Sequence, residues 1–255
     1  MVNLFNKIVV ITGAGSGIGQ AVALSFLKEG AVTCLLGRRK NKLIETKNIA
    51  KKKCYIGKAI LFSCDVTDEK KIKTLFKSIK KDLKRIDFLF NNAGIALSFT
   101  AFDEIMYKDW KKVIDTNVNG MFLCAKYAYQ IMKNQKPKGG RIINNGSISA
   151  YSPRLGSAAY TASKHAVTGL TKSISLDGRK DKVVCSQIDI GNAYTSLTKS
   201  FSKGTIQASG YVIAEPTINV NDVAKTVISI CTLPLDTNII STIIIANNMP
   251  FVGRG

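Results

Sequence analysis

The stretch KIVVITGAGSGIGQAVALSFLKEG, residues 7–30, is an apolar run followed by a glycine-rich turn and then by a segment of helical period. Gly13, Gly17 and Gly19 give the turn the spacing G-x-x-x-G-x-G. Glycines permit unusual φ angles and let the backbone approach a pyrophosphate that sits at a helix N-terminus. Ile18 takes the place of the last glycine of the G-x-G-x-x-G pattern, so the turn alone also fits a plain tight turn. The flanking strand and helix favour nucleotide binding.

Along the rest of the chain, short apolar runs bounded by turn residues alternate with longer segments of helical period. This alternation is typical of repeated βαβ units, which build a parallel sheet. The expected strands are Lys7–Thr12, Val32–Leu36, Ala59–Ser63, Phe88–Phe90, Arg141–Asn144, Val183–Ile188 and Ile239–Ile245. The expected helices are Ile18–Glu29, Lys40–Lys52, Glu69–Leu83, Asp109–Met132, Ser157–Asp177 and Val220–Cys231.

We expect one domain over residues 1–255, because no linker rich in proline, glycine or serine divides the chain and no internal repeat is present. The predicted fold class is α/β, a doubly wound seven-stranded parallel sheet with helices on both faces. Residues 197–216 are polar, irregular and contain glycine. A loop of that length in a compact domain is usually functional, so we expect a substrate lid there.

The formal charge of +20 comes from 37 lysines and arginines against 17 acidic residues. The basic residues are spread over most of the chain, with the densest groups at Lys51–Lys53 and Lys77–Arg85. Lysine runs on helices are usually solvated faces, and no aromatic residues interleave them as a single-strand groove requires. We therefore expect a general attraction for anionic ligands but no specific nucleic-acid binding.

The six cysteines stand singly, with no C-x-x-C pair, and the chain has one histidine. This pattern predicts neither a zinc site nor a redox dithiol, and favours reduced, mostly buried thiols in the cytoplasm. The N-terminal apolar run is shorter than a signal-peptide core. The most apolar later stretch, Asn238–Ala246, is too short to span a bilayer, so no membrane association is expected.

Five motifs, spread over most of the chain, together resemble the short-chain dehydrogenase/reductase family. They are TGAGSGIG at Thr12–Gly19, NNAG at Asn91–Gly94, Asn117 in TNVNG, Ser147 in NNGSIS, and YTASK at Tyr160–Lys164. Each could arise by chance, but here all five follow the order of the family. The resemblance implies a Rossmann fold and a nicotinamide-dependent oxidoreductase that transfers hydride between the cofactor and a ketone or secondary alcohol.

Tyr160 and Lys164 are four residues apart, so on a helix they share a face and can point into one pocket. A lysine ammonium nearby favours the phenolate form of a tyrosine, which suits Tyr160 to act as general acid and base. The resemblance implies that Lys164 also bonds the nicotinamide ribose, that Ser147 bonds the substrate oxygen, and that Asn117 positions a water. Taken alone, each residue also fits a structural role, as core, solvated helix surface, turn former or helical amide.

Cofactor preference depends on the end of the second strand, where Gly37 is followed by Arg38 and Arg39 and no acid is present. An acid would repel a 2′-phosphate, whereas arginine grips it with two parallel bonds, so NADP(H) is preferred and NAD(H) remains possible. The resemblance implies that Asp65 faces the adenine, although it also fits a helix N-cap region. The resemblance also implies that Asn91 lies beside the adenosine ribose and that Thr195 bonds the nicotinamide carboxamide. The expected cofactor-binding residues are Gly13, Ser16, Gly17, Ile18, Gly19, Arg38, Arg39, Asp65, Val66, Asn91, Ala93, Gly94, Tyr160, Lys164, Gly191 and Thr195.

Two further positions lie next to these motifs. Ile190 precedes Gly191 where the family commonly has proline, which leaves a freer backbone under the nicotinamide, and Asp189 before it has no predicted role. His165 lies about 100° round the helix from Lys164, so we expect a packing residue rather than a base.

Substrate contacts are expected from residues above the carboxyl ends of the strands. The predicted set is Ser147, Tyr151, Arg154 and Tyr160, with Leu97, Phe99, Leu197, Phe201, Ile206 and Tyr211 around them. This mostly apolar set with one arginine favours a ketone on a hydrophobic or weakly anionic body. The alternatives are a 3-oxoacyl-acyl-carrier-protein reductase, a non-catalytic NADPH-sensing regulator, and a protein that associates with RNA or membranes through its charge. The resemblance also implies a homotetramer, or a dimer, paired through the helices Asp109–Met132 and Ser157–Asp177.

Overall fold

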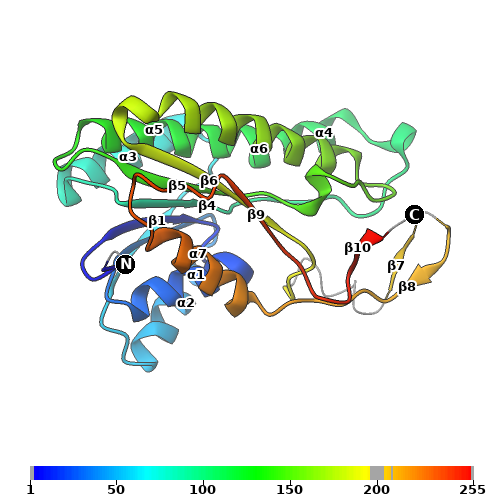
Figure 1. Cartoon of the computed structure of the whole chain (residues 1–255), viewed down its shortest axis with the longest axis horizontal. Helices are drawn as coiled ribbons and strands as arrows, with labels where there is room; N and C mark the ends of the chain where they lie inside the picture. The colour runs from blue at the N-terminus through cyan, green and yellow to red at the C-terminus, as the bar shows by residue number, and fades with distance from the viewer. Residues whose placement is uncertain (1–2, 196–203, 208, 254–255) are drawn as a thin grey trace.

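The computed structural model describes residues 3–195, 204–207 and 209–253, and its centre is a parallel sheet of seven strands (Figure 1). The strands are β1 Ile8–Thr12, β2 Val32–Gly37, β3 Lys58–Ser63, β4 Phe88–Asn91, β5 Gly140–Asn145, β6 Val183–Ile190 and β9 Ser241–Ile244. Their order across the sheet is β3-β2-β1-β4-β5-β6-β9. The chain order therefore reverses between β1 and β4, and such a switch point opens a ligand crevice at the carboxyl ends of the strands.

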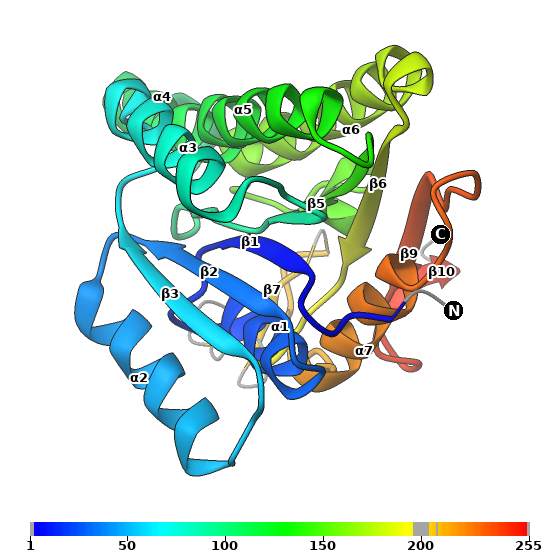
Figure 2. The ribbon, with the colours of Figure 1, turned by 90° about the vertical axis from the view of Figure 1, so that its left-hand side faces the viewer.

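Helices cover both faces of this sheet, which confirms the predicted α/β fold. They are α1 Gly17–Lys28, α2 Lys40–Lys52, α3 Glu69–Leu83, α4 Tyr107–Ile114, α5 Gly120–Asn134, α6 Ala158–Asp177 and α7 Val220–Cys231. One face carries α1, α2 and α7, and the other carries α3, α4, α5 and α6 (Figure 2). Val9 and Ile11 of β1 pack in the core with α1 and α7, whereas Val10 packs with α3 and α5. Because a central parallel strand is buried on both faces, its sequence is apolar throughout.

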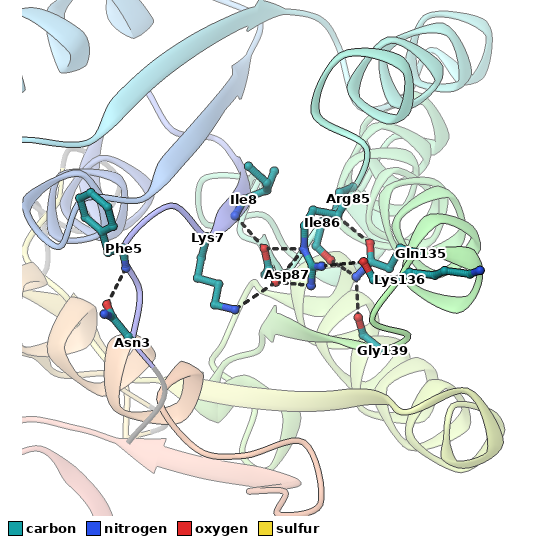
Figure 3. A network of polar contacts seen from close by, with 10 residues as sticks. All are labelled: Asn3, Phe5, Lys7, Ile8, Arg85, Ile86, Asp87, Gln135, Lys136 and Gly139. Carbon is teal, nitrogen blue, oxygen red and sulfur yellow. Dashed lines mark hydrogen bonds and ion pairs between the residues drawn. The ribbon is translucent and has the colours of Figure 1, made fainter.

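A polar network fastens the amino ends of β1 and β4 (Figure 3). Asp87, which directly precedes β4, accepts a 2.9 Å hydrogen bond from the Ile8 amide. Its carboxylate also pairs with Arg85 at 2.7 Å and lies 3.7 Å from the Lys7 ammonium. The Gln135 side chain donates to the carbonyl oxygen of Ile86 and accepts from its amide, both at 2.9 Å. These contacts fix the start of the two strands whose other ends flank the crevice.

The predicted helix Asp109–Met132 is wrong in one respect, because the chain there is not one regular helix. A π-helical segment at Asp115–Asn119 separates α4 from α5. Wider turns of this kind insert one residue into a helix and often mark functional sites. The other predicted helices and strands begin and end within two residues of the observed ones.

The predicted lid region is less irregular than its composition indicates. In its described part, β7 Thr205–Ile206 pairs antiparallel with β8 Val212–Ile213, at the far end of the molecule from α2 (Figure 1). A further short strand, β10, runs from Pro250 to Gly253. The remaining short helical turns are Phe102–Glu104, Ile148–Ala150 and Arg179–Asp181.

Five of the six cysteines are buried and Cys54 is exposed. Burial raises the pKa of the Cys34 thiol to about 12, so it stays protonated at neutral pH. Within the described ranges, no three histidine, cysteine or acidic side chains gather as metal ligands. None of the helices in the described part of the chain is long and apolar enough to cross a bilayer.

We predict that Asp87→Asn lowers the free energy of unfolding by about 1–2 kcal/mol, because it removes two ion pairs at a buried carboxylate whose partners are partly exposed. Urea unfolding measures this change, and Asp82→Asn on the exposed face of α3 is the control with the same charge change. Equal stability of the two variants would contradict the role given to the network.

Candidate active site

A cavity of about 550 Å³ opens at the switch point between β1 and β4. Its walls come from the glycine turn, the ends of β2, β4 and β5, and the turn after β6. The lining residues are Gly13, Gly15, Ser16, Gly17, Ile18, Gly37, Arg38, Arg39, Lys42, Leu43, Cys64, Asp65, Val66, Asn92, Ala93, Gly94, Ile95, Ala96, Thr116, Asn145, Gly146, Tyr160, Lys164, Ile190, Gly191, Ala193 and Thr195. Most of the residues expected to bind a cofactor are therefore at one surface.

The glycine turn is shaped by close contact with the segment after β4. A Cβ atom at Gly19 would collide with the Gly13 carbonyl oxygen and lie 2.6 Å from Nδ2 of Asn92. Thr12 Oγ1 accepts hydrogen bonds from the amides of Asn92 and Ala93 at 2.8 and 2.9 Å. Only glycine, which has no side chain, fits position 19. Because no side chain is present there, the start of α1 can approach the crevice.

The N-terminus of α1 is suited to an anion. Gly17, its first residue, has φ +55°, and the hydroxyl of the N-cap Ser16 makes no capping bond within the described chain. Arg39 Nη2 lies 3.4 Å from that hydroxyl. Unpaired amides and the helix dipole favour negative charge here.

Three basic side chains, Arg38, Arg39 and Lys42, line the β2 side of the cavity. Arg38 Nη1 lies 3.6 Å from Oδ2 of Asp65. Asp65 itself accepts from the Thr67 amide and hydroxyl at 3.0 and 2.9 Å. The N-cap of α3 is Asp68, which accepts from Lys71, so Asp65 is a cavity residue rather than the cap.

Tyr160 and Lys164 both reach this cavity from α6. Lys164 is 5% exposed, and its ammonium donates a 2.7 Å hydrogen bond to the Asn145 carbonyl oxygen at the end of β5. The same nitrogen lies 5.4 Å from the centroid of the Tyr160 ring. A buried ammonium held by one neutral acceptor keeps further donors for a ligand in the cavity.

A second cavity, of about 480 Å³, adjoins the first. It is lined by Ala96, Leu97, Ser98, Phe99, Ile105, Ser147, Ile148, Ser149, Arg154, Leu155, Gly156, Ser157, Ala159, Tyr160, Ile190, Gly191, Asn192, Gly204, Thr205 and Ile206. Tyr160 lines both cavities, whereas Ser147 lines only the second. Ser147 Oγ accepts a 3.1 Å bond from the Ser149 amide, which leaves its own O–H free to donate.

Asn117 lies in the π-helical segment and is buried behind the cavities. Its Oδ1 accepts from the Ile95 amide at 2.8 Å, and its Nδ2 donates to the Ile95 carbonyl oxygen at 2.9 Å. Nδ2 also donates to Ser163 Oγ at 3.0 Å. Asn117 thus ties the loop after β4 to α6, one residue before Lys164. This bridging role was not evident from the motif.

Several predicted site residues lie elsewhere. Asn91 is buried and donates to Met121 and Asn144, so the following residue, Asn92, faces the cavity in its place. Tyr151 points toward the far edge of the sheet, where its hydroxyl reaches Asp189 at 2.9 Å. Tyr211 is exposed and lines neither cavity. Leu197 and Phe201 lie outside the described residues.

His165 is also placed differently from expectation. It is exposed, and its Nδ1 lies 2.9 Å from the Thr161 carbonyl oxygen. The prediction of a packed residue is therefore wrong in the isolated chain. Sequence reasoning missed Lys42, which lies outside every motif, and Thr116 and Asn145, which lie within the motifs TNVNG and NNGSIS but had no predicted role.

Arg154 does line the second cavity, but its charge is already matched. Its Nη1 and Nη2 contact the two carboxylate oxygens of Glu215 at 2.7 and 2.5 Å. Burial raises the pKa of Glu215, but hydrogen bonds from Arg154, Gln207 and Asn192 outweigh it and hold the pKa at about 2. Glu215 is therefore ionised at neutral pH and neutralises the arginine.

Residues 7–205 match the family model described as short chain dehydrogenase. The chain belongs to this family. It is 36% identical to the 3beta-hydroxysteroid dehydrogenase of Mediterraneibacter gnavus over 77% of this chain and 69% of that protein. It is 32% identical to the meso-2,3-butanediol dehydrogenase of Serratia marcescens over 77% of this chain and 75% of that protein. The crystal structure of L-sorbose reductase from Gluconobacter frateurii with NADPH and L-sorbose has a TM-score of 0.83 at 22% identity, covering 95% of this chain and 97% of that one.

Membership makes this protein a short-chain dehydrogenase that acts on alcohol or ketone groups with a nicotinamide cofactor. The first cavity fits such a cofactor, because it combines a glycine cradle that side chains would fill, a free helix N-terminus and basic groups at one end.

We predict that Gly19→Ala destabilises the short-chain dehydrogenase by about 1–3 kcal/mol through overpacking and removes most of its affinity for dinucleotide, because the turn must shift away from Gly13 and Asn92. NADPH fluorescence titration and thermal unfolding measure the two effects. Gly169→Ala is the matched control, since nothing lies within 4 Å of a Cβ there and alanine favours the helix interior. Undiminished NADPH binding by Gly19→Ala would contradict this account of the turn.

Proposed function

We propose that the protein is an NADP(H)-dependent oxidoreductase that transfers hydride between the nicotinamide and a ketone or secondary alcohol, with Tyr160 as general acid and base. The observation that carries the proposal is the position of Tyr160, which lines both the glycine-turn cavity and the adjoining cavity that contains Ser147. A proton donor at the boundary of a cofactor site and a substrate site reaches the substrate oxygen while the reacting carbon faces the cofactor.

The residues divide the work as follows. Bound NADP(H) would supply or accept the hydride. In the reducing direction, the Tyr160 hydroxyl gives its proton to the substrate oxygen, and the Ser147 hydroxyl donates a hydrogen bond to the same oxygen as negative charge develops there. The Lys164 ammonium stabilises the resulting phenolate and keeps donors free for the cofactor. Asn117 keeps α6 in place against the loop after β4.

NADP(H) is the preferred cofactor in this proposal because the β2 end of the cavity is basic. Arg38, Arg39 and Lys42 line it, and Asp65 is paired with Arg38 rather than free to bind a ribose. A 2′-phosphate placed among three cations gains charge-assisted hydrogen bonds that NADH cannot make. NADPH is also what the related L-sorbose reductase structure contains.

The substrate is proposed to be a neutral ketone rather than an anionic one. Arg154 is the one cationic side chain among the described residues that line the second cavity, and Glu215 neutralises it. Apart from the Asn192 amide, the rest of the lining is apolar or hydroxyl-bearing. An anionic group would have to break a buried ion pair to gain a partner, which costs free energy.

A panel of carbonyl compounds distinguishes the proposal from its alternatives. The panel contains 2,3-butanedione, a 3-oxosteroid, L-sorbose, an anionic 3-oxo acid and a 3-oxoacyl thioester, each assayed by NADPH absorbance with NADH in parallel. Neutral ketones are expected to be reduced faster than the anionic acid. Selective turnover of the thioester would favour the carrier-protein reductase, and NADPH binding without turnover of any compound would favour a regulator.

Self-association as a homotetramer, or as a dimer, is part of the proposal. Exposed apolar side chains on α4, α5 and α6 support it, namely Tyr107, Phe122 and Leu176. Such residues are unfavourable in water and favour burial against a second copy. The cytoplasmic location stays a prediction from the sequence.

We predict that Tyr160→Phe lowers kcat by about 10²-fold or more, because the ring remains but the transferable proton is lost. The Kd of NADPH should change little. Single-turnover and steady-state reduction of the best panel ketone measure kcat, and Tyr55→Phe, which lines neither cavity, serves as the control. Full turnover by Tyr160→Phe would remove the residue from its proposed role.

We predict that Arg38→Ala raises the Kd of NADPH about 10-fold or more, since a hydrogen bond to a charged group is worth about 1.5–3 kcal/mol. The Kd of NADH should stay nearly constant, because no 2′-phosphate is present. Fluorescence titration with each cofactor provides the comparison, with Lys47→Ala on the exposed face of α2 as the charge-matched control. Equal weakening of both cofactors would argue against a phosphate contact.

A further inference from the structure

Asp189, which had no predicted role, is fully buried on β6, directly before Ile190, which lines the second cavity. Its carboxylate makes no ion pair among the described residues. It instead accepts hydrogen bonds from neutral donors on both of its oxygens. A buried carboxylate satisfied in this way is held in one position, because moving it would leave several donors unpaired.

The Oδ1 atom faces the serine turn. It accepts a 2.9 Å bond from the backbone amide of Ser147 and a 2.7 Å bond from Nε2 of Gln187. Gln187 is itself fixed by Thr168 of α6, whose hydroxyl accepts from Nε2 at 3.0 Å. The amide of Ser147 is thus tied to a rigid strand rather than to solvent.

The approach between Asp189 and this turn is tight. A Cβ atom at Gly146 would collide with Oδ1 of Asp189 and lie 2.9 Å from Cγ of Gln187. Position 146 therefore accommodates only glycine while Asp189 stays in place. The turn that carries Ser147 rests directly on the carboxylate.

The Oδ2 atom holds the other end of the same turn. Tyr151, directly after the helical turn Ile148–Ala150, donates its hydroxyl to Oδ2 at 2.9 Å, and Ser241 of β9 does so at 3.0 Å. Burial raises the pKa of Tyr151 and the nearby Asp189 raises it further, so the hydroxyl remains a donor. One carboxylate thereby brackets the turn Ser147–Tyr151 at both ends.

We propose that Asp189 is a positioning residue that fixes Ser147 for the reaction, an inference that rests on the proposed function. With its amide held by Asp189 and its Oγ accepting from the Ser149 amide, Ser147 has one hydrogen left to direct into the cavity. Asp189 does not touch the substrate. It acts by setting where the Ser147 hydroxyl lies relative to Tyr160, and small misplacements of such groups reduce turnover strongly.

Kinetics of Asp189→Ala and Asp189→Asn test the proposal. Asp189→Ala is expected to lower kcat about 10-fold or more with the Kd of NADPH within about twofold, because the first cavity is not lined by Asp189. Asp189→Asn should restore most of the kcat, since Oδ1 can still accept both N–H bonds and Nδ2 can donate to the two hydroxyls. Asp181→Ala is the matched control, a buried carboxylate on another turn whose loss should reduce stability without changing kcat.

A double-mutant cycle with Ser147→Ala separates positioning from general destabilisation. If Asp189 acts through Ser147, the variant carrying both alanines should have the kcat of Ser147→Ala alone. If Asp189→Ala does not fold, Asp189→Leu fills the same space without acceptors and takes its place in the cycle.

Three results would overturn the proposal: wild-type kcat for the apolar variant, an Asp189→Asn as slow as the apolar variant, or effects that multiply in the cycle. If Ser147→Ala lowers kcat but the effects of the two substitutions multiply, only the positioning role of Asp189 would be rejected. A Ser147→Ala that retains full turnover would instead fault the proposed reaction role of Ser147, and the positioning of that residue with it.

Discussion

The active site depends on one contact, between the end of β1 and the segment after β4. Thr12 Oγ1 accepts hydrogen bonds from the backbone amides of Asn92 and Ala93. In return, Asn92 Nδ2 donates to the Thr12 carbonyl oxygen at 3.1 Å. The Asn92 side chain then accepts at 2.9 Å from Asn145 Nδ2, and the Asn145 carbonyl oxygen receives the Lys164 ammonium. A continuous chain of hydrogen bonds therefore runs from the glycine turn to the lysine of α6, so the glycine turn and the pair Tyr160 and Lys164 are positioned by the same contacts.

In this arrangement α6 lines both cavities. The cavity of the glycine turn and the adjoining cavity meet at Tyr160, which under the proposed function fixes where a substrate oxygen must lie if its carbon is to face the cofactor. Asn117 also holds α6 in place, through its hydrogen bond to Ser163. The π-helical segment allows Asn117 to make these contacts. A regular helix from α4 to α5 would turn the Asn117 side-chain amide away from the loop after β4.

Local sequence patterns predicted the parts of the structure that depend on neighbouring residues. The apolar run of β1, the glycine spacing and the i, i+4 pair of α6 each follow from backbone geometry within one element. Contacts between residues that are far apart in the sequence leave no periodic pattern from which they could be predicted. The Arg154 and Glu215 pair joins residues 61 apart, so the sequence indicated Arg154 as a substrate contact but gave no sign of the carboxylate that neutralises it. For the same reason Tyr151 was expected at the substrate, although it bonds to Asp189, 38 residues away.

The turn after β6 shows how a departure from the family pattern is compensated. Ile190 stands where proline would stiffen the chain, yet β6 extends through it and pairs with Ile244 of β9. The Gly191 amide then donates to the Ile244 carbonyl oxygen at 2.9 Å, so the strand continues to the edge of both cavities. Sheet pairing thus supplies the rigidity that a proline ring would give, and it also fixes the backbone of Asp189. A carboxylate side chain can position the serine turn only if its own strand does not move, and the ladder between β6 and β9 provides that condition.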